Sequence, residues 1–200
     1  MSHYNTLHTL TGHSSHQRDI RKSRFLAQST PVTTSAQALD FVHATRDSAA
    51  THNCWAYRVG NNYRFHDDGE PGGTAGRPIL QAIESQAFDR VAVVVTRWFG
   101  GVKLGAGGLI RAYGGTAAEC LRLASSCPII PMARLSMHCD FAVLALLRAR
   151  LAELEATIEH ESFDAAGAHL AFSLPAQHVA TAEARIADVS RGRSTVHRLT

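Results

Sequence analysis

The stretch VAVVVTRWFGGVKLGAGGLIRAY, residues 91–113, decides the fold of the first half of the chain. It begins with a mostly β-branched run at residues 91–96 that lacks polar alternation, which is typical of a strand covered on both faces. A glycine-spaced loop follows, and after it we predict a helix from about residue 107 to residue 125. The stretch therefore indicates a buried strand, a shaped loop and a packed helix in direct succession.

Further strands and helices are predicted upstream of this stretch. The apolar patterns predict strands at residues 23–32, 52–59 and 62–65, and helices at residues 35–46 and near 76–85. Gly60-Asn61 is suited to the hairpin turn between two of these strands. Residues 1–17 are rich in His, Ser and Thr, and we expect them to be partly frayed, with a short strand around residues 4–10.

The sequence changes character at residues 127–131, CPIIP, because two prolines cannot continue a helix. We interpret this segment as a linker between a first domain at residues 1–126 and a second at residues 132–200. The patterns of the second domain predict the order βαββαβ, with strands at 134–139, 157–163, 168–174 and 194–199, and helices from 140 and near 177–190. That order is typical of a ferredoxin-like fold. The predicted class is α+β with two domains.

Composition and charge exclude several classes of protein. The 200 residues have the apolar and charged content of an ordinary globular protein, and a net charge of +3 alone makes no case for nucleic acid. The four cysteines show no disulfide or metal-binding spacing, so we expect reduced thiols. The sequence shows no membrane-spanning apolar run and no signal peptide, which predicts a soluble, cytoplasmic protein with no membrane partner.

The glycine-rich loop could bind phosphate at the start of the following helix. Gly105, Gly107 and Gly108 are the candidate residues. The spacing fits neither a P-loop, which needs Lys and Ser/Thr after the second glycine, nor the dinucleotide fingerprint, because Ile110 occupies its third glycine position. A generic anion site and a purely structural turn both remain open.

Basic residues are interleaved with aromatic ones around the same loop. Arginine and lysine bind phosphates, and aromatic rings stack on unpaired bases, so this composition could bind RNA. The alternative is a scatter of surface charges over buried aromatic rings. The candidate basic residues are Arg64, Arg77, Arg97, Lys103 and Arg111, interleaved with Tyr63, Trp98, Phe99 and Tyr113.

Other reactive side chains are weaker candidates. Asp67, Asp68 and Glu70 could bind a hard cation, but solvated turn residues are the favoured interpretation. Cys54 lies near His52, yet a packed core thiol is favoured over a nucleophile. The histidines show no metal-binding spacing. We therefore assign no catalytic residue, no metal site and no cofactor.

The motifs HNCWAYRVG, HDDGEPGGTAGRP and VVVTRWFGGVKLGAGGLIRAYGG, together with KSRFLA at residues 22–27, resemble those of the IMPACT/YigZ family. The resemblance covers most of residues 18–125, and the second domain resembles that of the bacterial members. It implies that the first domain has the fold of the second domain of ribosomal protein S-five, which also occurs in domain IV of elongation factor G. The second domain would resemble domain V of that factor. This tandem of factor-like domains implies a translation-linked role directed at RNA or the ribosome. The eukaryotic relatives regulate translation through a partner protein, and the resemblance does not extend that mechanism to this chain.

The expected function is regulation of translation through binding of RNA or the ribosome by the basic, glycine-rich face. Two alternatives use the same surface. One is a phosphate- or nucleotide-binding enzyme that holds its ligand in the glycine-rich pocket, and the other is a module that docks a protein partner. The non-enzymatic interpretation is favoured.

Overall fold

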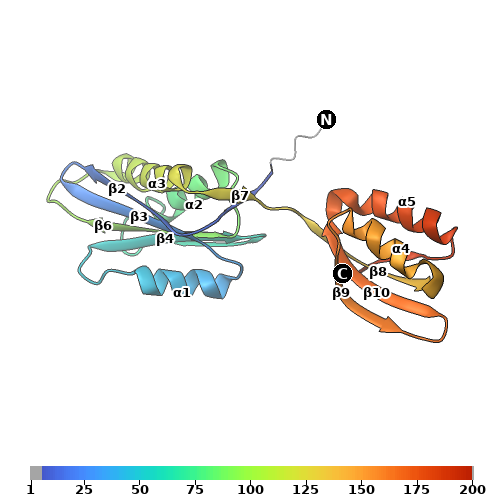
Figure 1. Ribbon diagram of the computed structural model, residues 1–200. Coiled ribbons are helices and arrows are strands. Elements are labelled where there is room, and N and C mark those ends of the chain that lie inside the picture. Colours follow the sequence, from blue (N-terminus) through green and yellow to red (C-terminus); the bar gives the residue numbers. More distant parts are fainter. Residues whose placement is uncertain (1–5, 200) are drawn as a thin grey trace. The chain divides into compact units, whose positions relative to one another are not determined.

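The computed structural model describes residues 6–199, and the chain divides between Ile129 and Ile130 into two compact units. Each unit combines helices with an antiparallel sheet, which confirms the predicted α+β class and two-domain layout (Figure 1). The predicted strand at residues 4–10 falls partly outside the described residues. Within them, β1 spans His8–Leu10.

The N-terminal unit is built on a five-stranded antiparallel sheet with the order β2-β3-β6-β4-β5. These strands span Ser14–Ile20 (β2), Ser23–Pro31 (β3), His52–Val59 (β4), Asn62–His66 (β5) and Val91–Trp98 (β6). The β-branched run of the opening stretch forms β6, which lies at the centre of the sheet between β3 and β4. Strand pairing on both edges therefore satisfies its backbone groups.

Helices cover both faces of this sheet, which explains the missing alternation in β6. Helix α1 (Ser35–Thr45) lies on one face, and helices α2 (Gly76–Ser85) and α3 (Ala106–Leu123) lie on the other (Figure 1). Val93 and Val95 belong to the larger core beneath α2 and α3, whereas Ala92 and Val94 belong to the smaller core beneath α1. The prediction of a strand buried on both faces is confirmed.

Two segments differ from the sequence-based expectation. Residues 14–17, expected to be frayed, form the start of the edge strand β2, which pairs with β3 over its whole length. Ser126–Pro128 form strand β7, which pairs with β1 in a separate two-stranded sheet. The predicted linker at residues 127–131 therefore begins inside the N-terminal unit, where pairing with β1 holds Cys127 and Pro128.

The C-terminal unit has the predicted βαββαβ order. Its elements are β8 (Met132–Asp140), α4 (Phe141–Ala152), β9 (Thr157–Phe163), β10 (Gly167–Pro175), the single 3₁₀ turn η1 (Ala176–His178), α5 (Val179–Ser190) and β11 (Val196–Leu199). The strands form one antiparallel sheet with the order β11-β8-β10-β9, and α4 and α5 pack on one of its faces. No helix within residues 6–199 is long and apolar enough to cross a lipid bilayer.

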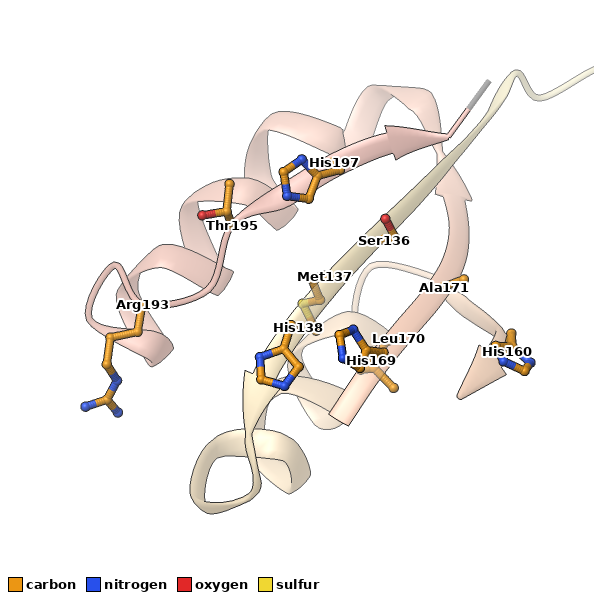
Figure 2. A pocket seen from close by; sticks show the side chains of 10 residues that line it. All are labelled: Ser136, Met137, His138, His160, His169, Leu170, Ala171, Arg193, Thr195 and His197. Atoms are coloured by element: carbon orange, nitrogen blue, oxygen red, sulfur yellow. The ribbon is translucent and has the colours of Figure 1, made fainter. Parts of the chain in front are cut away.

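The other face of the C-terminal sheet carries no helix among the described elements and has a hollow of about 420 Å³. Four histidines contribute to its lining, one from each strand of the sheet (Figure 2). They are His197, His138, His169 and His160.

Candidate functional site

The glycine-rich loop after β6 is held against the turn between β2 and β3. The Gly100 N–H donates to Oγ of Ser23, the first residue of β3, at 3.3 Å. A second contact holds the loop elsewhere: the Phe99 N–H donates at 3.0 Å to Oγ1 of Thr51, the residue before β4. A Cβ on Gly100 would lie 1.7 Å from the carbonyl oxygen of Lys22, so a side chain there would force the two backbones apart. Glycine is therefore required for the loop to reach the β2–β3 turn.

Helix α3 begins directly after this loop, and no side chain caps it. Its N-cap residue, Gly105, has φ +70°, a left-handed conformation that glycine adopts without strain. Uncapped N–H groups and the positive end of the helix dipole favour a negatively charged group at this end of α3. Gly105 lines a cavity there, and Gly107 lies next to the Arg111 guanidinium.

Two hollows share Leu104 in their walls. The first, which we call the α3 cleft, has a volume of about 430 Å³, and its lining includes His52, Glu70, Arg97, Phe99, Lys103 and Gly105. The second, which we call the arginine groove, has a volume of about 310 Å³ and is lined by Arg18, Ile20, Arg21, Leu104, Gly108, Arg111 and Ala112. Together they place the candidate glycines Gly105 and Gly108 on one surface that runs past Leu104.

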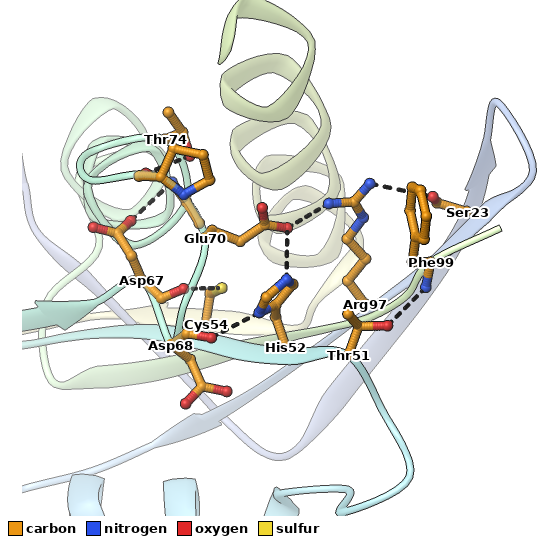
Figure 3. Close-up of polar contacts among 12 residues, drawn as sticks. Ser23, Thr51, His52, Cys54, Asp67, Asp68, Glu70, Thr74, Arg97 and Phe99 are labelled. Atoms are coloured by element: carbon orange, nitrogen blue, oxygen red, sulfur yellow. Dashed lines mark hydrogen bonds and ion pairs between the residues drawn. The ribbon is translucent and has the colours of Figure 1, made fainter. Parts of the chain in front are cut away.

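A buried polar network forms one wall of the α3 cleft. Arg97 Nη1 donates to Glu70 Oε1 at 2.5 Å, and the Tyr113 hydroxyl donates to the same oxygen at 2.8 Å. His52 Nε2 lies 3.8 Å from that oxygen (Figure 3). His52 Nδ1 lies 2.7 Å from the carbonyl oxygen of Asp68, which can only accept, so Nδ1 carries the hydrogen. His52 of β4 and Arg97 of β6 thus both point toward the buried carboxylate of Glu70.

This network corrects the prediction for Arg97. The sequence predicts that Arg97 contacts RNA phosphates, but only 5% of it is exposed, and its charge is paired with Glu70. Pairing explains the burial, because an arginine taken out of water needs a partner of opposite charge. Arg97 also lines the α3 cleft. Its Nε–H group is buried and has no hydrogen-bond partner within residues 6–199.

The structure does not bring Asp67, Asp68 and Glu70 together as the alternative of a hard-cation site requires, and it buries Glu70, which the favoured interpretation treats as a solvated turn residue. Asp67 accepts backbone N–H groups from Gly73, Ala75 and Gly76 at 2.8–3.0 Å, at the start of α2. Asp68 Oδ2 accepts the backbone N–H of Asn53 at 2.7 Å. Glu70 belongs to the buried network described above. Their ligand atoms do not form a group of three within metal-binding distance in the described part of the chain.

Asp67 should make folding more favourable above its own pKa. Burial raises the pKa of Asp67, but the three backbone N–H groups outweigh burial and lower it overall. A carboxylate with a lowered folded-state pKa stabilises the fold above the unfolded pKa, and that stabilisation is lost as the pH falls through the folded value. Asp67→Ala should therefore lower the free energy of unfolding by about 1 kcal/mol at neutral pH. The difference should shrink below about pH 4.

Urea unfolding of the two proteins at pH 7 and pH 3 measures this effect. Tryptophan fluorescence reports on the N-terminal unit alone, because both tryptophans, Trp55 and Trp98, lie there. Asp19→Ala, at an exposed position of β2, is the matched control. A difference between Asp67→Ala and the wild type that is equally large at both pH values would contradict the proposed role of the carboxylate.

Cys54 is a core thiol, as the favoured interpretation predicts. It is fully buried in β4, and its Sγ donates to the carbonyl oxygen of Asp67 at 3.0 Å. Burial strongly raises the pKa of Cys54, and the nearby Glu70 carboxylate raises it further. The reactive thiolate form is therefore disfavoured at neutral pH. Burial likewise raises the pKa of the Tyr113 hydroxyl, which remains a hydrogen-bond donor to Glu70.

The predicted basic residues separate into three groups in the structure. Lys103 lines the α3 cleft and Arg111 lines the arginine groove, both with exposed side chains. Arg64 and Arg77 are exposed but line neither hollow, and Arg64 lies over the Trp55 ring. Arg97 is buried. The structure thus brings together Lys103, Arg111 and the candidate glycines, and leaves Arg64 and Arg77 outside this surface.

Sequence reasoning missed Arg18 and Arg21, which line the arginine groove. A signal was present, because the segment RDIRKSR at residues 18–24 contains four basic residues. The antiparallel pairing of β2 with β3 and the packing of α3 on these strands bring this segment beside α3. A basic run far from the glycine loop in sequence therefore becomes its neighbour in the fold.

The cleft lies in a region that matches a known family. Residues 21–121 match the Impact N-terminal domain, and residues 137–193 match a domain of unknown function, DUF1949. A Thermus thermophilus protein, described as an IMPACT family member in pol 5'region, is 49% identical over 160 residues, which cover 78% of this chain and 86% of the relative. The chain belongs to the IMPACT family.

Further relatives match most of this chain or less than half of it. IMPACT family member YigZ of Escherichia coli is 34% identical over 181 residues, 87% of this chain and 88% of YigZ. Protein IMPACT of Oryctolagus cuniculus is 37% identical over 93 residues, which cover 42% of this chain and 29% of the rabbit protein. A crystal structure of a hypothetical protein matches 98% of both chains with a TM-score of 0.72 and 30% identity. The predicted IMPACT/YigZ resemblance is confirmed.

Proposed function

We propose that this IMPACT-family protein binds RNA, as a free strand or within the ribosome, through the surface formed by the α3 cleft and the arginine groove. The observation that carries the proposal is a row of four exposed basic side chains that runs from the loop before α3 to the middle of that helix. They are Arg18, Arg21, Lys103 and Arg111. The proposal agrees with the translation-linked role that the family resemblance implies, and it includes a cytoplasmic location.

The charges of this surface favour an anionic ligand. None of the four basic side chains forms an ion pair with another residue in the range 6–199. The nearby Glu70 carboxylate is buried and neutralised by Arg97. The uncapped end of α3 adds partial positive charge beside them. A phosphate backbone that passes Leu104 could contact all of these groups in succession.

Exposed apolar side chains next to these charges favour RNA over a small anion. Phe99, in the wall of the α3 cleft, is 45% exposed, and Val102 and Ile110 are also exposed on the loop and on α3. Unpaired bases stack on exposed aromatic rings, whereas inorganic phosphate gains nothing from them. The combination of basic side chains and an accessible ring therefore suits a single-stranded segment of RNA.

Salt dependence of binding tests this proposal. Fluorescence anisotropy with a labelled single-stranded RNA should show that log K falls with log salt at a slope of about −0.7 for each phosphate contacted, or about −2.8 for four contacts. Arg111→Gln should reduce the magnitude of that slope by about 0.7, and Arg77→Gln, outside both hollows, should leave it unchanged.

Two results would contradict RNA binding by this surface. One is the absence of any anisotropy change with RNA and of cosedimentation with ribosomes. The other is binding that does not depend on salt. A mononucleotide that stabilises the protein against heating while RNA does not bind would favour the small-ligand alternative instead.

A further inference from the structure

The helix-free face of the C-terminal sheet brings together side chains that lie far apart in the sequence. Along β8, Leu135, Met137 and Cys139 pack beneath the helices, so the alternate residue His138 faces the other side. In the same way, Ala168 and Leu170 of β10 point to the core. Antiparallel pairing sets His169 directly opposite His138. The two imidazole rings lie 4.4 Å apart between their centroids.

Asp164, in the turn between β9 and β10, completes a cluster with these two rings. Its Oδ2 lies 2.8 Å from His169 Nε2 and 3.4 Å from His138 Nε2. Of all groups of histidine, cysteine and acidic residues in the described chain, this is the one whose ligand atoms lie within metal-binding reach of one another. His138 Nε2 is buried and has no hydrogen-bond partner within residues 6–199.

The turn that carries Asp164 is built to hold the carboxylate in this orientation. Asp164 Oδ1 accepts the backbone N–H groups of Ala166 and Gly167 at 2.7 and 2.8 Å, which leaves Oδ2 for the two imidazoles. A Cβ on Gly167 would lie 2.1 Å from the carbonyl oxygen of Cys139 and 3.1 Å from His138 Nε2. Glycine at this position therefore allows the turn to approach β8 closely enough for the cluster to form.

We propose that His138, His169 and Asp164 form a binding site for a divalent transition-metal ion of the zinc type. Two imidazole nitrogens with one carboxylate suit zinc and its neighbours, whereas calcium and magnesium prefer oxygen ligands alone. Ligand atoms in a tetrahedral zinc site lie about 3.3 Å apart, given zinc–ligand bonds of about 2.0 Å. The separation between His138 and Asp164 already has this value, and the contact between His169 and Asp164 needs to open by only about half an ångström.

The site leaves one coordination position for solvent or a further ligand, because three protein ligands occupy three positions of a tetrahedral ion. That position faces the hollow on the open face of the sheet, where His138 and His169 lie side by side and His197 lies apart from them (Figure 2). The turn hydrogen bonds to Asp164 Oδ1 remain in place when Oδ2 binds the ion. They act as outer contacts that orient the carboxylate.

Zinc titration of the full-length protein tests the site. Isothermal titration calorimetry of the metal-free protein with Zn²⁺ should show one site whose affinity falls at least about tenfold in His169→Gln and in Asp164→Asn, since even outer contacts of a metal are worth that much. Asp164→Asn keeps an oxygen that can accept the turn N–H groups. His197→Gln, in the same hollow but outside the cluster, should leave the affinity unchanged.

Cobalt provides an independent readout. Co²⁺ bound by two imidazoles and a carboxylate should give visible absorption in the wild type and in His197→Gln, and that absorption should be lost in His169→Gln. Circular dichroism checks that each variant is folded. Absence of Zn²⁺ binding by the wild type would overturn the proposal. So would wild-type affinity in folded His169→Gln, because the ion would then lie elsewhere on the chain.

Discussion

Arg97→Met should lower the free energy of unfolding of the N-terminal unit by about 3–5 kcal/mol. The substitution removes the partner of Glu70 and leaves a carboxylate that is 8% exposed without its compensating charge. The Tyr113 hydroxyl still donates to Glu70, but one neutral hydrogen bond does not replace an ion pair. Urea unfolding followed by tryptophan fluorescence measures the loss, because Trp55 and Trp98 both belong to this unit.

Two further variants separate the effect of the buried charge from that of the arginine side chain. Arg77→Met changes an exposed arginine of the same unit and should alter stability by no more than about 0.5 kcal/mol. The double variant Glu70→Gln/Arg97→Met removes both charges and should recover part of the stability that Arg97→Met loses. A loss of less than about 1 kcal/mol in Arg97→Met would show that Glu70 does not depend on the ion pair.

The sequence predicts those strands and helices whose burial is visible in their own pattern of apolar and polar residues. Strand β6 is recognisable because Val91–Val95 lack polar alternation, and the structure buries them on both faces. The βαββαβ order of the C-terminal unit is recognisable because Leu135 and Met137, like Leu170 and Phe172, alternate with outward residues. In both cases, burial follows directly from the local apolar pattern.

The sequence does not predict strands that form only because they pair with another strand. Strand β2, SSHQRDI, has no apolar alternation, and its pairing with β3 is what makes it a strand. Strand β7 contains Pro128, which indicated a linker, yet proline is tolerated at the end of an edge strand. Local propensity contains no information on such pairings, so the sequence predicts neither β2 nor β7, although the division between the two units does lie within the predicted linker.

The same limit applies to the functional side chains. Of the basic residues that the sequence singles out around the glycine loop, Lys103 and Arg111 line the two hollows. The pairing of Arg97 with Glu70, however, joins residues from two elements and is invisible in a list of charges. The contact of His138 with His169 depends on the register of β8 and β10, which sequence spacing does not contain.

Neutralising the proposed RNA surface should have the second large effect. In the triple variant Arg21→Gln/Lys103→Gln/Arg111→Gln, one of the four basic side chains remains. Between about 50 and 200 mM salt, the wild type should lose about 50-fold in RNA affinity if four phosphates are contacted, whereas the triple variant should lose only about threefold. The physical reason is that fewer counterions are released from the RNA when fewer phosphates are neutralised.

A second triple variant serves as the matched control, because it changes the net charge by the same amount but outside the proposed RNA surface. Arg46→Gln/Arg64→Gln/Arg77→Gln removes three exposed arginines that line neither hollow. If RNA binding depended only on overall charge, the two triple variants would lose the same affinity. A difference between them therefore reports on the surface and not on the charge of the protein.

The most direct test is the RNA affinity of these two triple variants, measured side by side with the wild type by fluorescence anisotropy at several salt concentrations. We predict that the Arg21/Lys103/Arg111 variant binds weakly and with little salt dependence, while the Arg46/Arg64/Arg77 variant retains the affinity and the salt slope of the wild type. Equal losses in the two variants, or wild-type binding by the first, would contradict RNA binding at the α3 cleft and the arginine groove.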